Sequence, residues 1–213
     1  MKLIFFKQSG FSIKSIAVVL FFLAVSLSSP SIMAAEENVI YLSGERAKQA
    51  LENRREKINK NPDDVSALVD AGIILHQMNR VTPSQDQVIE AERYLKKAYR
   101  ANKEDYETLA WLGSTITMKA QFESDPGRQT YFVKSGTIKL DKSIRAQPDN
   151  QIIRLTRAYN SLEIPAFLKR TRFAVEDFEA YIELCKVQKC PDHEVVAAKD
   201  NLIKAKNIIA SNP

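Results

Sequence analysis

The sequence has few of the residues that enzyme active sites usually need. It contains two histidines, His76 and His193, which lie far apart in the chain, and only 6 glycines. It has no G-x-S-x-G nucleophile motif, no glycine-rich phosphate loop and no dinucleotide-binding fingerprint. A hydrolase or transferase needs a nucleophile together with a base and an orienting group. We therefore expect a protein that catalyses no reaction and binds no cofactor.

A strong excess of charge of one sign is also missing. The chain has 31 Lys and Arg against 26 Asp and Glu, and three of the 31 (Lys2, Lys7 and Lys14) precede the first acid, Glu36. The residues from 36 onward thus have 28 basic against 26 acidic side chains. Basic and acidic residues are also mixed along this part, as in residues 52–57, which is typical of solvated helix faces. We therefore expect no nucleic-acid partner.

Long hydrophobic runs are limited to one, Ile16–Leu27. Its 12 residues are fewer than the roughly 20 that cross a bilayer as a helix. Lysines precede the run, and small residues, including Ala34 and Ala35, follow it. This order is typical of a cleavable secretory signal. It predicts a signal peptide over residues 1–35, export to the periplasm or cell envelope, and no membrane span after cleavage. The alternative is a segment that stays uncleaved as a membrane anchor.

Alternation of the strand type is absent, and from Gly44 onward apolar residues recur every three or four positions, which indicates helices. Turns, most of them with a proline, divide this part into eight predicted helices, near 45–60, 63–78, 84–101, 104–121, 130–146, 150–163, 171–186 and 192–210. Two starts suggest specific caps. Asn61 can cap the helix that Pro62 begins, and Thr82 with Gln85 can form a capping box around Pro83.

Three of these helices repeat one spacing of large and small residues, and the helix after each has a matching pattern. The first set is Leu68, Ala71, Gly72 and Leu75; Leu109, Leu112, Gly113 and Ile116; and Leu155, Ala158, Tyr159 and Leu162. The second set is Ala91, Leu95 and Ala98; Gly136, Leu140 and Ser143; and Ala174, Phe178 and Tyr181. Residues 61–186 therefore resemble three tetratricopeptide repeats. The resemblance implies that residues 36–213 form an all-α, right-handed solenoid of antiparallel helical hairpins, with terminal helices as caps.

The repeats are longer than the usual tetratricopeptide unit. Successive units begin at Pro62, Lys103 and Pro148, so their spacings are 41 and 45 residues, against about 34 in the standard repeat. We place the additional residues in long turns at 78–84 and 122–129, between the two helices of a pair. These turns would project from one edge of the solenoid.

In the family that the chain resembles, the first helix of each pair lines a concave binding surface. Here that surface would display Ser66, His76, Gln77, Glu107, Ser114, Thr117, Thr156 and Asn160. Some members bind a partner's C-terminal carboxylate with Asn and Lys at set positions. Asn160 matches one such position, but Ile73, Val69 and Ala110 occupy others, so the clamp is incomplete. The candidate partner groove comprises His76, Gln77, Ser114, Thr117, Thr156 and Asn160; otherwise these residues form a solvated inner face.

The chain has only 2 cysteines, Cys185 and Cys190. In an exported protein such a pair favours a disulfide. The alternatives are a metal site that adds His193 and Asp192, and two free thiols. The C-x4-C spacing lacks the second ligand pair that structural zinc sites have. We predict the disulfide and no bound metal.

Two further features have both a structural and a binding interpretation. Trp111, the single tryptophan, is predicted to be buried beneath the 122–129 turn; the alternative is a binding hot spot. A local basic cluster consists of Arg154, Arg157, Arg170 and Arg172. It forms either a solvated face or a patch for an acidic partner or an anionic lipid surface.

Together these features predict a non-catalytic scaffold or adaptor that binds other proteins. Two alternatives stay open at this point. The first is an accessory subunit of an envelope machine or transporter, tethered by an uncleaved N-terminus. The second is a small-ligand-binding helical protein that uses a cavity between its hairpins.

Overall fold

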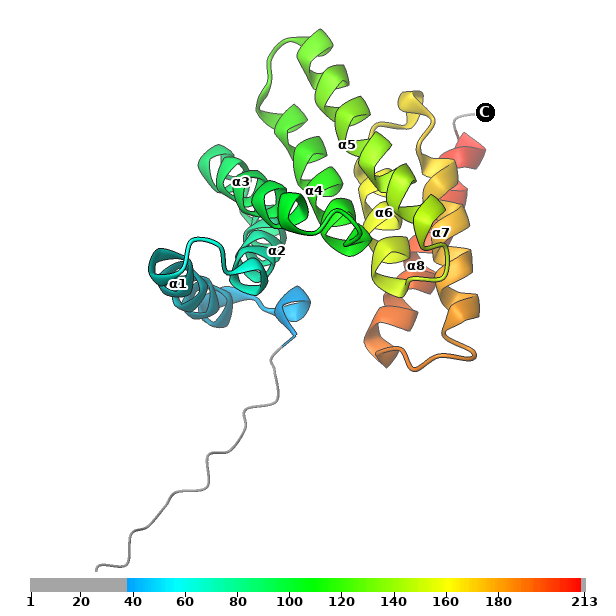
Figure 1. Cartoon of the computed structure of the whole chain (residues 1–213). Coiled ribbons are helices and arrows are strands. Elements are labelled where there is room, and N and C mark those ends of the chain that lie inside the picture. Colours follow the sequence, from blue (N-terminus) through cyan, green and yellow to red (C-terminus); the bar gives the residue numbers. More distant parts are fainter. Residues whose placement is uncertain (1–37, 212–213) are drawn as a thin grey trace, which may run out of the picture. The chain divides into compact units, whose positions relative to one another are not determined.

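The computed structural model describes residues 38–211, and within this range every regular element is a helix (Figure 1). The elements are η1 (Val39–Tyr41), α1 (Gly44–Lys60), α2 (Val65–Val81), α3 (Gln85–Ala101), α4 (Tyr106–Met118), η2 (Lys119–Phe122), α5 (Pro126–Ala146), α6 (Gln151–Glu163), η3 (Ala166–Leu168), α7 (Thr171–Leu184) and α8 (Asp192–Ser211). The all-α prediction is confirmed for these residues. The predicted signal peptide, residues 1–35, lies outside them.

Side-chain caps fix where most of the α-helices begin. The side chains of Asp64, Ser84, Asp105, Asp125 and Asn150 each accept a hydrogen bond from the backbone N–H three residues further on. The predicted caps Asn61 and Thr82 were wrong, because these residues end α1 and α2 instead. Asn61 Oδ1 accepts from the nearby Asp63 N–H (3.2 Å), which leaves the first turn of α2 to Asp64.

The two predicted long turns were also wrong, since helix occupies most of both segments. α2 continues to Val81, which leaves residues 82–84 between α2 and α3. α5 begins at Pro126 because Asp125 Oδ1 accepts from the Arg128 N–H (2.7 Å). The additional residues therefore lengthen helices: α3 has 17 residues and α5 has 21.

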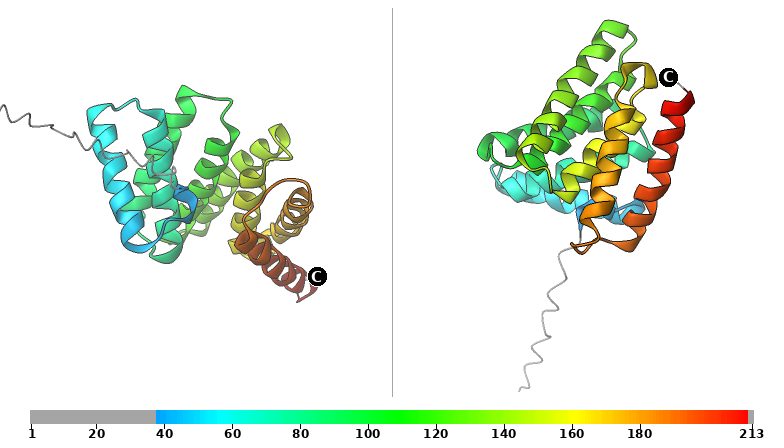
Figure 2. Two further views of the ribbon diagram at one scale, coloured as in Figure 1. Left: turned by 90° about the horizontal axis from the view of Figure 1, so that it is seen from below. Right: turned by 90° about the vertical axis from the view of Figure 1, so that its right-hand side faces the viewer.

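Helices adjacent in the chain pack against each other, and alternate helices also make contact. α2 packs on α3, α4 on α5, and α6 on α7, while α4 contacts both α2 and α6. Figure 2 shows the paired helices from two further directions. Two close approaches occur at glycines. A Cβ on Gly72 would lie 2.5 Å from Leu95 Cγ, and one on Gly113 would lie 2.7 Å from the Gly136 carbonyl oxygen.

The repeated sequence positions supply much of the core. Leu68, Leu75 and Leu95 are almost wholly buried in a cluster that joins η1 and α1–α4. A second cluster joins α6, α7 and α8 around Phe178 and Tyr181. A third cluster connects α4, α5 and α6. Each large apolar side chain contributes about 1.5–3 kcal/mol of stability when fully buried. Because α4 and α6 each belong to two of these clusters, the clusters stabilise neighbouring helix pairs together.

The C-terminal helix is tied to the helix before it by a disulfide between Cys185 and Cys190, whose Cα atoms are 5.5 Å apart. Cys185 is the C-cap of α7, and Cys190 lies just before α8. The predicted disulfide is present, so the free-thiol alternative was wrong. Within residues 38–211 no group of three or more His, Cys, Asp or Glu side chains could hold a metal ion. None of the helices in this range is long and apolar enough to span a bilayer.

Candidate functional site

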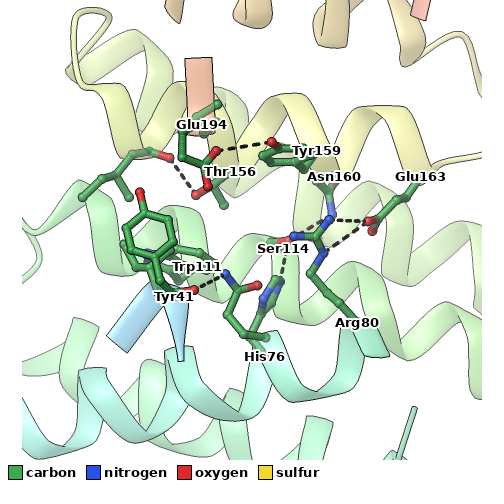
Figure 3. Close-up of a pocket in the computed structure, with 14 residues that line it drawn as sticks. Tyr41, His76, Arg80, Trp111, Ser114, Thr156, Tyr159, Asn160, Glu163 and Glu194 are labelled. Carbon is green, nitrogen blue, oxygen red and sulfur yellow. Dashed lines mark hydrogen bonds and ion pairs between the residues drawn. The ribbon is translucent and has the colours of Figure 1, made fainter. Parts of the chain in front are cut away.

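Side chains of α2, α4 and α6 enclose a pocket of about 180 Å³, which η1 and the first turn of α8 complete (Figure 3). Five of the six predicted groove residues line it: His76, Gln77, Ser114, Thr156 and Asn160. The sixth, Thr117, lines an adjacent pocket of about 410 Å³ between the C-terminal ends of the same helices, η2, the start of α5 and η3. The structure thus brings all six residues into one region. Ser66 and Glu107, which were also expected there, line neither pocket.

A chain of buried hydrogen bonds connects the three helices at the base of the pocket. His76 Nε2 lies 2.8 Å from Ser114 Oγ. Asn160 Nδ2 donates to Ser114 Oγ (3.3 Å) and to Thr117 Oγ1 (2.5 Å). The Thr117 hydroxyl in turn donates to the Ser114 carbonyl oxygen (2.7 Å). The donor side of the Asn160 amide is therefore engaged within the protein.

Two buried polar atoms of this network have no hydrogen-bond partner among the described residues: His76 Nδ1 and Asn160 Oδ1. Their residues are only 4% and 5% exposed. The Ser114 hydroxyl oxygen accepts a hydrogen bond from Asn160, so its O–H can donate to His76 Nε2. The neutral imidazole then has its proton on Nδ1. The unsatisfied pair is then one donor and one acceptor. Because an unpaired buried polar group costs about 1–3 kcal/mol, both atoms favour a bound partner.

The His76 ring is neutral near neutral pH. Burial lowers the pKa of His76 from 6.5 to about 3, and the positive charge of Arg80 acts in the same direction. The ring lies edge-on to Trp111, with centroids 5.1 Å apart. Trp111 is buried, as predicted, at 5% exposure. However, its neighbour is His76, and no residue of the 122–129 segment lines the pocket that contains it.

The pocket also contains three charged side chains that are not among the predicted groove residues, Arg80, Glu163 and Glu194. Arg80 Nη2 pairs with Glu163 Oε1 (3.1 Å), and its guanidinium lies 5.0 Å from the centre of the Tyr159 ring. Glu194, from the first turn of α8, accepts a hydrogen bond from the Tyr159 hydroxyl (3.3 Å). Burial is the largest cause that raises the pKa of Tyr159, and the negative charge of Glu194 is the second. These three charged residues join the predicted groove residues in lining the pocket.

The predicted basic cluster is an ion-pair network, not a basic patch. Arg157 Nε and Nη2 donate to the two oxygens of Asp177 (2.6 and 2.9 Å), and Arg154 Nη1 donates to Asp177 Oδ1 (2.7 Å). Arg170 contacts both oxygens of Asp141 (2.7 and 3.0 Å). Glu176 of α7 also pairs with Arg154 and Arg157 (3.3 and 2.7 Å), so three acids from α5 and α7 offset the charges of these three arginines. Arg172 is exposed beside the Phe173 ring, at 4.8 Å.

These carboxylates respond differently to their surroundings. Burial favours the neutral form of Asp141, but Arg170 and Arg157 outweigh it and hold the pKa of this carboxyl below its usual range. At Asp177, which is 0% exposed, burial outweighs the two arginines and raises the pKa. The network therefore holds a desolvated carboxylate by direct hydrogen bonds, as a structural ion pair does.

No family model matches the sequence, and neither the curated proteins nor the solved structures compared with it include a significant match.

Proposed function

We propose that residues 38–211 form a tetratricopeptide-like, right-handed solenoid that binds other proteins and catalyses no reaction. One observation carries this proposal: α2, α4 and α6 pack in a row and turn polar side chains, two of them with unpaired buried atoms, into adjoining pockets. The burial of the motif positions in the first two units and the close helix crossings at Gly72 and Gly113 support the repeat assignment, while among the motif positions in the first helix of the third unit only Ala158 is fully buried. α1 and α8 would then be the capping helices.

The geometry around Ser114 favours binding over catalysis. His76 Nε2 and Ser114 Oγ are within hydrogen-bond distance, as a nucleophile and its general base would be. However, a base with a pKa of about 3 is far too weak at neutral pH. In addition, no carboxylate accepts from His76 Nδ1 among the described residues, so the acidic orienting group of a catalytic triad is missing.

We further propose that the protein acts in the periplasm or cell envelope after removal of residues 1–35. The basic, short apolar and small-residue segments of that region carry this part of the proposal. Intact-mass analysis of the protein from the exported fraction tests it. A mature N-terminus at Ala35 or Glu36 is expected, whereas retention of residues 1–34 would favour a membrane-tethered subunit.

Site-specific photo-crosslinking tests the interaction surface. Phe167 is 78% exposed at the edge of the larger pocket, and Tyr131 on α5 is 64% exposed and lines neither pocket. In two separate variants, a photoreactive phenylalanine analogue replaces Phe167 or Tyr131, and crosslinking is carried out in the cells that make the protein. We expect a discrete crosslinked partner from position 167 and none from position 131. Equal labelling from both positions, or none from 167, would argue against a groove-mediated interaction.

A second candidate function is small-ligand binding, which the pocket between α2, α4 and α6 and its unpaired buried atoms favour. A thermal-shift screen with metabolites tests it. A ligand that raises the unfolding temperature of the native chain, while the photo-crosslink is absent, would make this the better assignment.

A further inference from the structure

We propose that the pocket between α2, α4 and α6 recognises an ammonium group on an apolar stem. This inference rests on the proposed function, because it names the chemistry by which the interaction surface selects its partner. It starts from the Glu194 carboxylate, which lines the pocket and forms no ion pair among the described residues. The hydrogen bond from the neutral Tyr159 hydroxyl leaves the carboxylate without a cationic partner.

The other ionisable groups of the pocket do not supply a counter-charge for Glu194. Arg80 is paired with Glu163, and His76 is neutral because burial keeps its pKa near 3. The pocket therefore has a net charge of one negative unit. Burial is the largest cause that raises the pKa values of Tyr41 and Tyr159, and the negative charge of Glu194 is the second. The same two causes raise the pKa of Tyr181 to about 12. The field of Glu194 thus acts on three tyrosines.

The surfaces around this charge fit a cation. In Figure 3, Glu194 and Tyr159 lie on the opposite side of the pocket from His76. Tyr41 forms one end of the pocket, and Trp111 lies behind Tyr41 in this view. Aromatic faces attract ammonium groups, and the attraction grows when the group is desolvated. The unpaired Asn160 Oδ1 can accept one of the ammonium hydrogens. An anionic ligand would meet both Glu194 and this carbonyl oxygen, and a neutral ligand would leave Glu194 without a counterion.

The size of the pocket limits what can enter. Its volume of about 180 Å³ is less than the roughly 300–1,000 Å³ of pockets that hold drug-sized molecules. One amino-acid side chain or one small amine fills such a space. The ligand is therefore a lysine side chain or chain N-terminus of a protein partner, or a free alkylamine; all present the same ammonium chemistry.

Trp111 fluorescence gives a direct readout, because this residue is the single tryptophan and lines the pocket. We titrate the full chain with n-butylammonium, n-butanol and butyrate at constant ionic strength. A saturable change with n-butylammonium alone is expected. Equal responses to n-butylammonium and n-butanol, or no response to the amine, would overturn the proposal.

A charge-neutralising variant tests the role of Glu194. Glu194→Gln keeps the shape and can still accept from Tyr159, so the fold should persist, as circular dichroism can verify. We expect amine affinity to fall roughly tenfold or more, the usual effect of losing a charged hydrogen-bond partner. Glu183→Gln removes the same charge from an exposed position of α7 outside the pocket and should change nothing. Unchanged binding by Glu194→Gln would show that Glu194 is not the counterion.

Peptide titrations identify the source of the ammonium group. An acetylated, amidated pentapeptide with one lysine among alanines is compared with its glutamine analogue and with n-butylammonium. Tighter binding of the lysine peptide supports a protein partner, and preference for the free amine supports a small ligand. The two proposals fail separately: amine binding without a crosslink at position 167 rejects the protein interaction alone. A crosslink without amine selectivity rejects only the ammonium site.

Discussion

Gly113 of α4 and Gly136 of α5 face each other where the two helices cross. A Cβ on Gly113 would lie 2.7 Å from the Gly136 carbonyl oxygen, and one on Gly136 would collide with the Gly113 carbonyl oxygen and with Thr117. Backbone atoms cannot swing aside as the end of a flexible side chain can. The crossing therefore depends on the absence of a side chain at both positions.

Gly113→Ala should destabilise the protein by about 1–3 kcal/mol, the usual cost of overpacking, although alanine has the higher helix propensity. Gly127→Ala is the matched control. A Cβ there would meet only the Asp125 carboxylate, at 3.1 Å, so we expect a change within about 0.5 kcal/mol. Urea denaturation midpoints measure both variants. Equal midpoints for the two would contradict the close crossing.

The repeat spacing was sufficient to predict which residues of α2–α5 would pack, because large and small residues at fixed intervals specify one helix face. Gly72, Gly113 and Leu95 lie in the contacts that this spacing implies. The helix ends were less predictable, since several polar residues near each proline could act as the cap. Asp64 capped α2 where Asn61 was expected, and only the backbone geometry decides between them.

The pocket could be predicted in part for a similar reason. His76, Ser114 and Asn160 follow from the helix faces, but Arg80 lay beyond the predicted end of α2. Glu194 comes from α8, and no local pattern indicates that the first turn of this helix meets α6. Contacts between elements distant in the chain depend on how all helices pack, which periodicity does not encode.

His76 should make stability depend on pH. Its pKa is lowered from 6.5 in an unfolded chain to about 3 in the folded state, so the unfolded state binds the proton first as pH falls. The stability due to the neutral ring is fully present above about pH 6.5 and is lost as pH falls toward 3. Between pH 7.5 and pH 5 the loss should be about 2 kcal/mol, at about 1.4 kcal/mol for each unit of pKa difference.

The difference in unfolding free energy between the native chain and His76→Gln isolates this effect from all other titrating groups. It should shrink by about 2 kcal/mol from pH 7.5 to pH 5, measured by urea denaturation at both values. His193→Gln, which removes the other histidine from an exposed position, is the matched control. A constant difference for His76→Gln would mean that folding does not change the pKa of His76.

Arg157 and Asp177 should show strong coupling in a double-mutant cycle. Their side chains are 5% and 0% exposed, with Arg157 Nε and Asp177 Oδ2 2.6 Å apart. Asp177→Leu removes the buried carboxylate and leaves Arg157 to the more exposed Asp141 and Glu176, which should cost about 3–5 kcal/mol. The double variant Arg157→Leu/Asp177→Leu should be less destabilised than the single variant. Additive losses would indicate that the two residues do not stabilise each other.

This ion pair also explains why the sequence suggested a basic patch. Arg154 and Arg157 lie close together in the chain, while Asp177 is on the next helix and Asp141 on the preceding one. A charge pattern read along one segment detects like charges near each other but not the opposite charges that packing brings to them. The outcome depends on the α5–α6–α7 contacts, so the cluster could not be assigned before the fold was known.

The disulfide should stabilise the position of α8. Cys185 and Cys190 enclose a short loop, and the chain-entropy relation gives a stabilisation of about 2 kcal/mol for closing it. The bond holds the start of α8 against α7. Phe178 of α7 is fully buried in the cluster that the two helices share. Replacing both cysteines by serine should lower the unfolding free energy by about that amount. Amide hydrogen exchange should accelerate in α8 more than in α1, because local opening begins where the constraint is lost. Thiol titration of the unreduced, denatured protein should find no free cysteine. Two titratable thiols, or equal acceleration in both helices, would contradict this role for the bond.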